Sequence, residues 1–194
     1  STKLDIVEGI AFEREIFVRL MATNEAKSMR HMFFAEREAT KIPDVPADTP
    51  VRDIQSAAII GSGTMGGGIA MCFANAGIPV TVIDMEQDAL SRGLEKVRSN
   101  YQVSAKRGSM AQADVETRMA LITGSTDIKD AGAADIVIEA VFEDIELKKT
   151  IFAELDGIMG DGAILATNTS ALDIDAIAAA TKRPEAVIGT HFFS

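Results

Sequence analysis

Residues 55–84 read QSAAIIGSGTMGGGIAMCFANAGIPVTVID, a stretch that contains a strand, a glycine-rich turn, a helix and a second strand. An apolar run leads into the pattern G-x-G-x-x-G, and the second strand closes on Asp84. A lone G-x-G-x-x-G is common by chance, but this order of elements is typical of a dinucleotide-binding unit in a parallel sheet. The alternative is a glycine-rich turn in some other α/β protein.

The three glycines of the turn have different tasks in such a unit. Gly61 allows the tight turn out of the strand, Gly63 lets a pyrophosphate approach the backbone, and Gly66 lets the helix pack close to the sheet. The helix N-terminus then offers N–H groups to the phosphates. Asp84 can accept hydrogen bonds from the adenosine ribose, and its charge repels a 2′-phosphate. No arginine or lysine follows Asp84 directly, so the sequence predicts NAD rather than NADP.

Length, charge and cysteine usage narrow the class of protein. A chain of 194 residues that is 47% hydrophobic can form one medium domain with an appendage. Acidic residues outnumber basic ones 29 to 19, which argues against nucleic acid or an anionic membrane surface as a partner. The single cysteine, Cys72, cannot form an internal disulfide, so we expect an intracellular location, either a bacterial-type cytoplasm or another intracellular compartment. The place of Cys72 on the helix after the glycine turn predicts buried packing. The sequence predicts no membrane span.

The chain divides at its prolines. Residues 1–40 carry helical periodicity, with Thr23 as a candidate N-cap between two helices, and residues 41–53 hold three prolines and predict an extended linker. Residues 54–194 alternate strands with helices. We expect strands at about 57–61, 80–84, 122–125, 135–140, 163–167 and 187–192, and helices at about 65–76, 87–107, 111–120, 146–159 and 173–180. This alternation predicts an α/β fold, a Rossmann-type doubly wound parallel sheet preceded by a short helical segment.

Ligands of such sheets bind at the carboxyl ends of the strands, so polar residues that follow strands are candidates for the site. Three groups stand out, and they are Glu139, Val141, Phe142, Glu143, Asp144 and Lys148 after the fourth strand, Asn168, Thr169 and Ser170 after the fifth, and His191 to Ser194 at the end of the sixth. Each group has a structural alternative. Glu143 and Lys148 could form a solvated helix face, Ser170 could cap a helix, and His191 could be structural.

Four segments resemble the NAD-binding domain of L-3-hydroxyacyl-CoA dehydrogenases. They are IIGSGTMGGGIA, IEAVFE, ATNTSAL and GTHFFS, and they occur in the family's order and spacing across residues 54–194. Within residues 1–40, FEREIFVRL and FFAEREA resemble the last helices of the enoyl-CoA hydratase (crotonase) domain. The combination resembles the multifunctional α-subunit of the fatty acid oxidation complex.

The resemblance implies a role for each matching residue. His191 would be the catalytic acid/base that takes the proton of the substrate 3-hydroxyl while hydride passes from C3 to the nicotinamide. Ser170 would lie near the nicotinamide and the substrate oxygen and count as both catalytic and cofactor-binding. The other cofactor contacts that the resemblance implies are Gly61, Gly63, Met65, Gly66, Asp84, Val141, Phe142, Glu143, Lys148 and Ser194, with no metal. Many relatives have asparagine where this chain has Ser194.

The enzyme that the resemblance implies is an NAD-dependent 3-hydroxyacyl-CoA dehydrogenase within a bifunctional hydratase–dehydrogenase. It would oxidise L-3-hydroxyacyl-CoA to 3-ketoacyl-CoA in fatty acid β-oxidation, with an acyl-CoA, the rest of the chain and a thiolase subunit as partners. The family's histidine-orienting glutamate and its C-terminal helical domain come later than Ser194, so we expect an inactive fragment of a larger enzyme.

Two other functions stay open. One is a stand-alone 3-hydroxybutyryl-CoA dehydrogenase, against which residues 1–53 argue, because such enzymes begin near the glycine strand. The other is a non-catalytic NAD-binding module, against which the pairing of His191 with Ser170 argues.

Overall fold

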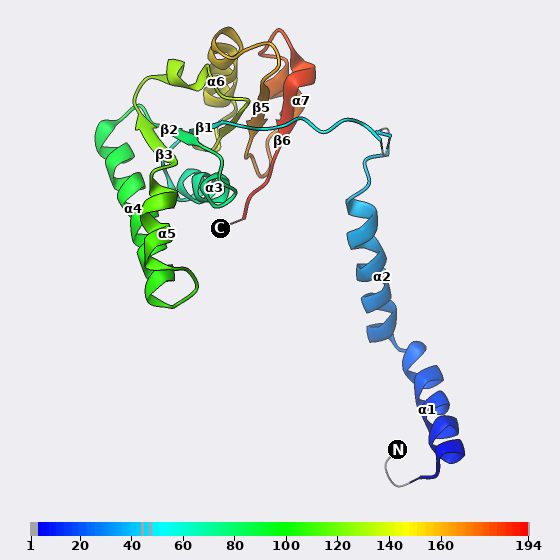
Figure 1. Cartoon of the computed structure of the whole chain (residues 1–194). Helices are drawn as coiled ribbons and strands as arrows, with labels where there is room; N and C mark the ends of the chain where they lie inside the picture. The colour runs from blue at the N-terminus through cyan, green and yellow to red at the C-terminus, as the bar shows by residue number, and fades with distance from the viewer. Residues whose placement is uncertain (1–3, 44, 47, 194) are drawn as a thin grey trace. The chain divides into compact units, whose positions relative to one another are not determined.

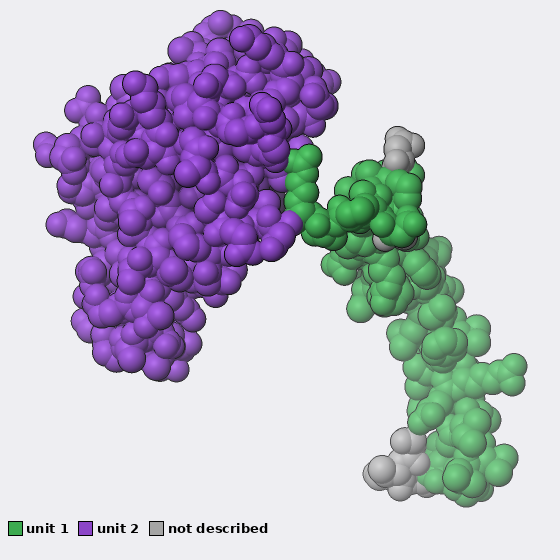
Figure 2. Space-filling view, turned by 45° about the horizontal axis from the view of Figure 1, so that its top comes forward, with its two compact units in different colours: residues 1–52 green, residues 53–194 purple. Residues whose placement is uncertain are grey.

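The computed structural model describes residues 4–43, 45–46 and 48–193. The chain forms two compact units, Ser1–Arg52 and Asp53–Ser194, which Figure 2 colours green and purple. Ser194, one of the implied cofactor contacts, lies outside the described residues. Among the described residues, no helix combines the length and the apolar character that a bilayer crossing needs.

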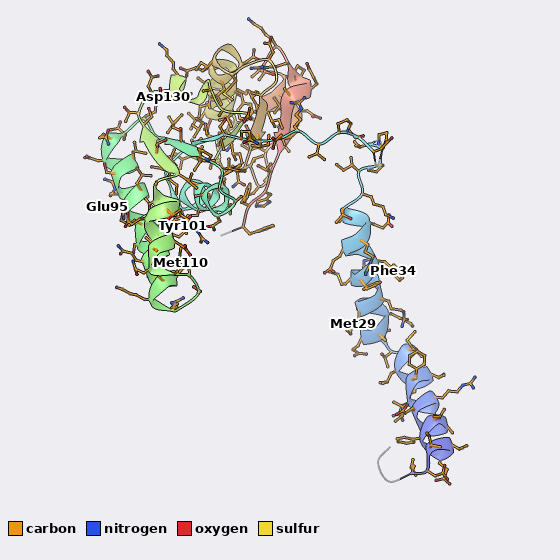
Figure 3. The ribbon with its side chains drawn as sticks, in the orientation of Figure 1. Met29, Phe34, Glu95, Tyr101, Met110 and Asp130 are labelled. Atoms are coloured by element: carbon orange, nitrogen blue, oxygen red, sulfur yellow. The ribbon has the colours of Figure 1, made fainter. Side chains whose placement is uncertain are left out.

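The first unit contains two helices, α1 (Ile6–Met21) and α2 (Asn24–Ala39). Thr23 caps α2 as expected, since its hydroxyl accepts a hydrogen bond from the Ala26 N–H at 3.2 Å. Both helices carry large apolar side chains that are exposed, among them Met29 and Phe34 on α2 (Figure 3). The described residues of 41–53 form no helix or strand, but the Val45 N–H donates to the Ile42 carbonyl at 3.1 Å, so the expected linker is not extended throughout.

The second unit is built on a six-stranded parallel sheet (Figure 1). Its strands are β1 (Ala57–Ile60), β2 (Val80–Ile83), β3 (Ile122–Ser125), β4 (Ile136–Glu139), β5 (Ile164–Thr167) and β6 (Val187–Gly189). They lie in the order β3-β2-β1-β4-β5-β6, and every pairing is parallel. This confirms the doubly wound fold. The strand order reverses between β1 and β4, which places the ligand crevice at the carboxyl ends of these two strands.

Helices cover both faces of the sheet, as the sequence predicts. They are α3 (Thr64–Asn75), α4 (Gln87–Lys106), α5 (Gln112–Met119), α6 (Ile145–Ile158) and α7 (Ile174–Ala178), with short 3-10 helices at Ile128–Ala131 and Pro184–Ala186. Successive β1 residues point to opposite faces. Ile59 joins a core with Ile69 and Val97 from α3 and α4, whereas Ala58 joins a second core with Phe152 from α6.

Two expectations about individual residues are wrong. Cys72 is exposed rather than buried, because the buried side of α3 runs through Gly66, Ile69, Ala70 and Ala74, and a step of 100° per residue carries Cys72 away from that side. The sixth strand ends at Gly189 instead of 192, so His191 follows the strand by two residues. Beyond the strand, the Asn168 side-chain oxygen accepts a hydrogen bond from the Phe192 N–H at 2.7 Å.

Candidate functional site

The glycine turn joins β1 to α3 at the crevice. Gly61 has a φ of +104°, and a Cβ at Gly66 would lie 1.9 Å from the Gly61 carbonyl oxygen, so the fold itself requires both glycines. A Cβ at Gly63, by contrast, would meet no atom within 4 Å. Gly63 is the N-cap of α3, and no side chain of the described residues caps that helix. An open, uncapped helix N-terminus beside a residue without a side chain fits the pyrophosphate of a dinucleotide.

Asp84 follows β2 directly and lies beside this turn. Its Oδ2 accepts hydrogen bonds from the Ser62 backbone N–H at 3.0 Å and from the Ser62 hydroxyl at 2.5 Å, and its Oδ1 accepts the Glu86 N–H at 3.3 Å. Partial burial raises the pKa of Asp84, but the hydrogen bonds from Ser62 and Glu86 and the charge of Arg92 outweigh burial and hold that pKa below its ordinary value. Asp84 is therefore an ionised acceptor at neutral pH.

Ser62 is a residue that the sequence reasoning missed. It is buried, and a Cβ at Gly93 of α4 would lie 2.3 Å from its carbonyl oxygen, so α4 packs directly against the turn. The available signal was a hydroxyl between two glycines of the motif, where it can reach a carboxylate at the end of the neighbouring strand.

Across the strand-order reversal, Glu139 ends β4 with its carboxylate fully buried. The Lys148 ammonium donates to its two oxygens at 2.7 and 2.8 Å, the Thr167 hydroxyl donates at 2.7 Å, and the Val141 N–H donates at 2.7 Å. Thr167 was also missed, although it sits opposite Glu139 in the parallel register of β4 and β5. The structure buries Lys148, so its direct contact with a cofactor stays a prediction.

Glu143 ties the loop after β4 to the loop after β5. Its Oε1 accepts hydrogen bonds from the Thr169 hydroxyl, from the Ser170 N–H at 2.8 Å and from the Ala171 N–H at 3.3 Å. Its Oε2 lies 3.5 Å from the Lys148 ammonium. Burial raises the pKa of Glu143, but the hydrogen bonds and the Lys148 charge outweigh it and lower that pKa below its usual range.

The residues with the implied chemistry lie at the carboxyl ends of β5 and β6. Ser170 is exposed, and α7 is capped by Asp173, which leaves the Ser170 hydroxyl outside the helix cap. His191 is exposed and stacks on Phe193 with ring centroids 4.5 Å apart. Within the described part of the chain, no hydrogen bond joins His191 to Ser170. Of the other implied contacts, Phe142 is exposed, whereas Val141 and Met65 are half-buried.

Comparisons with known proteins agree with this geometry. Residues 56–194 match the family described as "3-hydroxyacyl-CoA dehydrogenase, NAD binding domain". The peroxisomal bifunctional enzyme of Cavia porcellus is 41% identical over 191 residues, covering 96% of this chain and 26% of that protein. The fatty acid oxidation complex subunit alpha of Shewanella sp. (strain W3-18-1) is 39% identical over 188 residues, covering 96% of this chain and 26% of that protein. The chain thus spans about a quarter of the length of these curated relatives.

A solved structure gives a similar result. The (S)-3-hydroxybutyryl-CoA dehydrogenase of Ralstonia eutropha matches with a TM-score of 0.71 and 40% sequence identity. The match covers 73% of this chain and 50% of that chain.

Proposed function

This chain belongs to the family of 3-hydroxyacyl-CoA dehydrogenase NAD-binding domains, and we propose that it binds NAD and supplies the acid/base for oxidising L-3-hydroxyacyl-CoA to 3-ketoacyl-CoA. One observation carries the proposal. Asp84 and the open Gly63 turn lie on one side of the strand-order reversal, and Glu143, Ser170 and His191 follow the strands on the other side. A dinucleotide binds across such a reversal, with one half on each side.

The residues present fit NAD in both halves. The N-terminus of α3 would hold the pyrophosphate, and Asp84 would hold the adenosine ribose through Oδ1, since Ser62 already occupies Oδ2. The loops that carry Glu143 and Ser170 would then face the nicotinamide half. When bound, NAD supplies the hydride acceptor.

His191 and Ser170 would handle the substrate oxygen. The His191 imidazole would accept the proton of the 3-hydroxyl as the C3–H bond breaks with its electron pair leaving as hydride, so that the alcohol becomes a ketone. The Ser170 hydroxyl would hydrogen-bond to the same oxygen. Both side chains are exposed at the crevice side of the sheet, which leaves them accessible to a substrate.

We further propose that the chain is part of a bifunctional hydratase–dehydrogenase, organised as hydratase-type helices at 1–40, a linker at 41–53 and the NAD-binding domain at 54–194. The share of this chain that the relatives match supports this organisation. The curated relatives match 96% of the chain, whereas the solved 3-hydroxybutyryl-CoA dehydrogenase matches 73%. The proposal includes fatty acid β-oxidation, an acyl-CoA substrate, a thiolase partner and an intracellular location, in the cytoplasm or in an organelle.

The test is NADH formation from 3-hydroxybutyryl-CoA, followed by near-ultraviolet absorbance. For this assay the chain would replace the matching region of the Shewanella relative, because that relative is longer than this chain. We expect turnover, and we expect His191→Ala to lower it by about 10² to 10⁴-fold. His31→Ala, which removes an exposed histidine of α2, is the matched control and should leave the rate unchanged. A His191→Ala variant that turns over like the parent would contradict the proposed role.

A further inference from the structure

The proposed chemistry leaves one buried ionic group unused, the carboxylate of Glu139. Its side chain is 0% exposed, and that of its partner Lys148 is 1% exposed. Burying two charges is costly, and breaking such a pair leaves an uncompensated charge in the interior. Here every oxygen of Glu139 is satisfied, by two bonds from Lys148 and one each from Thr167 and Val141. The pair is therefore fixed in one geometry.

This pair closes a loop of the candidate site. Glu139 is the last residue of β4, and Lys148 lies in the first turns of α6, so the ion pair joins the two ends of the segment 140–147. That segment carries Glu143. The Val141 N–H bond to Glu139 fixes the start of the same loop.

Lys148 connects Glu139 to Glu143. The Lys148 ammonium lies between two carboxylates, with Glu139 at 2.7 Å and Glu143 Oε2 at 3.5 Å. The other oxygen of Glu143 holds the backbone N–H of Ser170 at 2.8 Å. A continuous set of contacts therefore runs from the buried end of β4 to the loop after β5.

We propose that Glu139 is a positioning residue for the nicotinamide half of the dinucleotide site, acting through Lys148 and Glu143 on the loop of Ser170. This inference rests on the proposed function, since it assumes that a dinucleotide binds across the crevice. A purely stabilising ion pair is the alternative, and buried pairs can often be replaced by neutral residues without loss of stability.

Two variants distinguish the positioning role from a purely stabilising ion pair. One removes the charge of Glu139, and the other removes the charges of both Glu139 and Lys148. Glu139→Gln leaves the buried Lys148 ammonium with Glu143 as its carboxylate partner, so Lys148 should move toward Glu143 and disturb the contact with Ser170. The double variant Glu139→Gln/Lys148→Met buries no charge and should regain the stability that the single variant loses. Glu143 nevertheless loses its cation in the double variant, so the loop of Ser170 should stay poorly held.

The experiment titrates the full chain with two ligands, NADH and ADP-ribose, which lacks the nicotinamide. We expect both Glu139 variants to bind NADH about tenfold more weakly than the parent, the factor that corresponds to one lost hydrogen bond to a charged group. ADP-ribose affinity should stay within about twofold, because the Gly63 turn and Asp84 are unchanged. Tyr101→Phe is the matched control (Figure 3). It removes a buried hydroxyl that is hydrogen-bonded to Asn75, on the face of the sheet opposite to α6, and it should change neither affinity.

The outcomes are distinct. A Glu139→Gln variant that keeps its ADP-ribose affinity but binds NADH about tenfold more weakly than the parent supports the positioning role, because this variant leaves Lys148 in place. A double variant that binds NADH like the parent overturns it, as does an equal loss of both ligands, which would mean general damage. A parent chain that binds neither ligand would instead refute the proposed function, on which this inference depends.

Discussion

The Ser62 backbone N–H and hydroxyl both donate to the same carboxylate oxygen of Asp84, at 3.0 and 2.5 Å. The glycine turn therefore holds Asp84, the residue that would select the cofactor in the proposed function. Because Ser62 occupies Oδ2, the ribose would meet Oδ1, whose described partner is the Glu86 N–H at a longer 3.3 Å. In the proposed function, phosphate binding and cofactor selection would thus be joined by the two hydrogen bonds between Ser62, which follows β1, and Asp84, which follows β2.

Ser62→Ala should lower the free energy of unfolding at pH 7 by about 1 kcal/mol or less, because it removes one hydrogen bond to a partly exposed carboxylate. The pKa of Asp84 is lowered in the folded chain, so Asp84 contributes stability above its unfolded pKa, and that contribution is lost as the pH falls through its folded pKa. The difference between parent and variant should therefore shrink below about pH 4. Urea unfolding at pH 7 and at pH 3 measures it. A difference that grows in acid would contradict this account of Asp84.

Gly63→Ala should leave the fold intact and weaken NADH binding. Gly63 has a φ of −65° and ψ of −171°, which alanine adopts, and its Cβ would point into the open space that the pyrophosphate would use. We expect affinity to fall by at least about tenfold. Gly68→Ala is the matched control on the same helix, with open space around its Cβ and an expected gain of about 0.5–1 kcal/mol in stability. Equal NADH affinities of Gly63→Ala and Gly68→Ala would contradict the proposal that the pyrophosphate binds beside Gly63.

Gly66→Ala should instead destabilise the fold. Its Cβ would lie 1.9 Å from a backbone oxygen of Gly61, so α3 must move away from the sheet, at a cost of about 3 kcal/mol or more. Thermal unfolding measures this change. A melting temperature equal to that of Gly63→Ala would show that α3 and the turn do not pack as described.

Arg183→Ala should cost about 3 kcal/mol of stability. The guanidinium closes the C-terminal end of α6 by donating to the Asp156 carboxylate at 3.0 Å and to the carbonyls of Gly160 and Met159 at 2.6 and 3.0 Å. Lys182→Ala, at an exposed neighbouring position, is the control and should change stability by less than about 0.5 kcal/mol. Equal decreases of the urea midpoint in Arg183→Ala and Lys182→Ala would argue against a role of the Arg183 side chain in capping α6.

The sequence predicts the sheet well because its strands are short apolar runs bounded by glycines and polar residues. It predicts side-chain partners poorly, since these depend on register and on helix rotation. Ser62 and Asp84 are 22 positions apart, and Thr167 and Glu139 are 28 apart. The sequence alone is compatible with an exposed Lys148 on a solvated helix face. In the structure, the rotation of α6 brings Lys148 into contact with the buried carboxylate of Glu139. Cys72 reads as buried until the rotation of α3 is known.

Calorimetric titration of the chain with NADH and with NADPH tests the central claim most directly. Because Asp84 would meet the adenosine ribose and repel a 2′-phosphate, we predict that NADH binds at least about tenfold more tightly than NADPH. Asp84→Ala should weaken NADH binding and narrow that difference. Equal affinities of the parent chain for the two cofactors, or no binding of either, would contradict the assignment of this crevice as an NAD site.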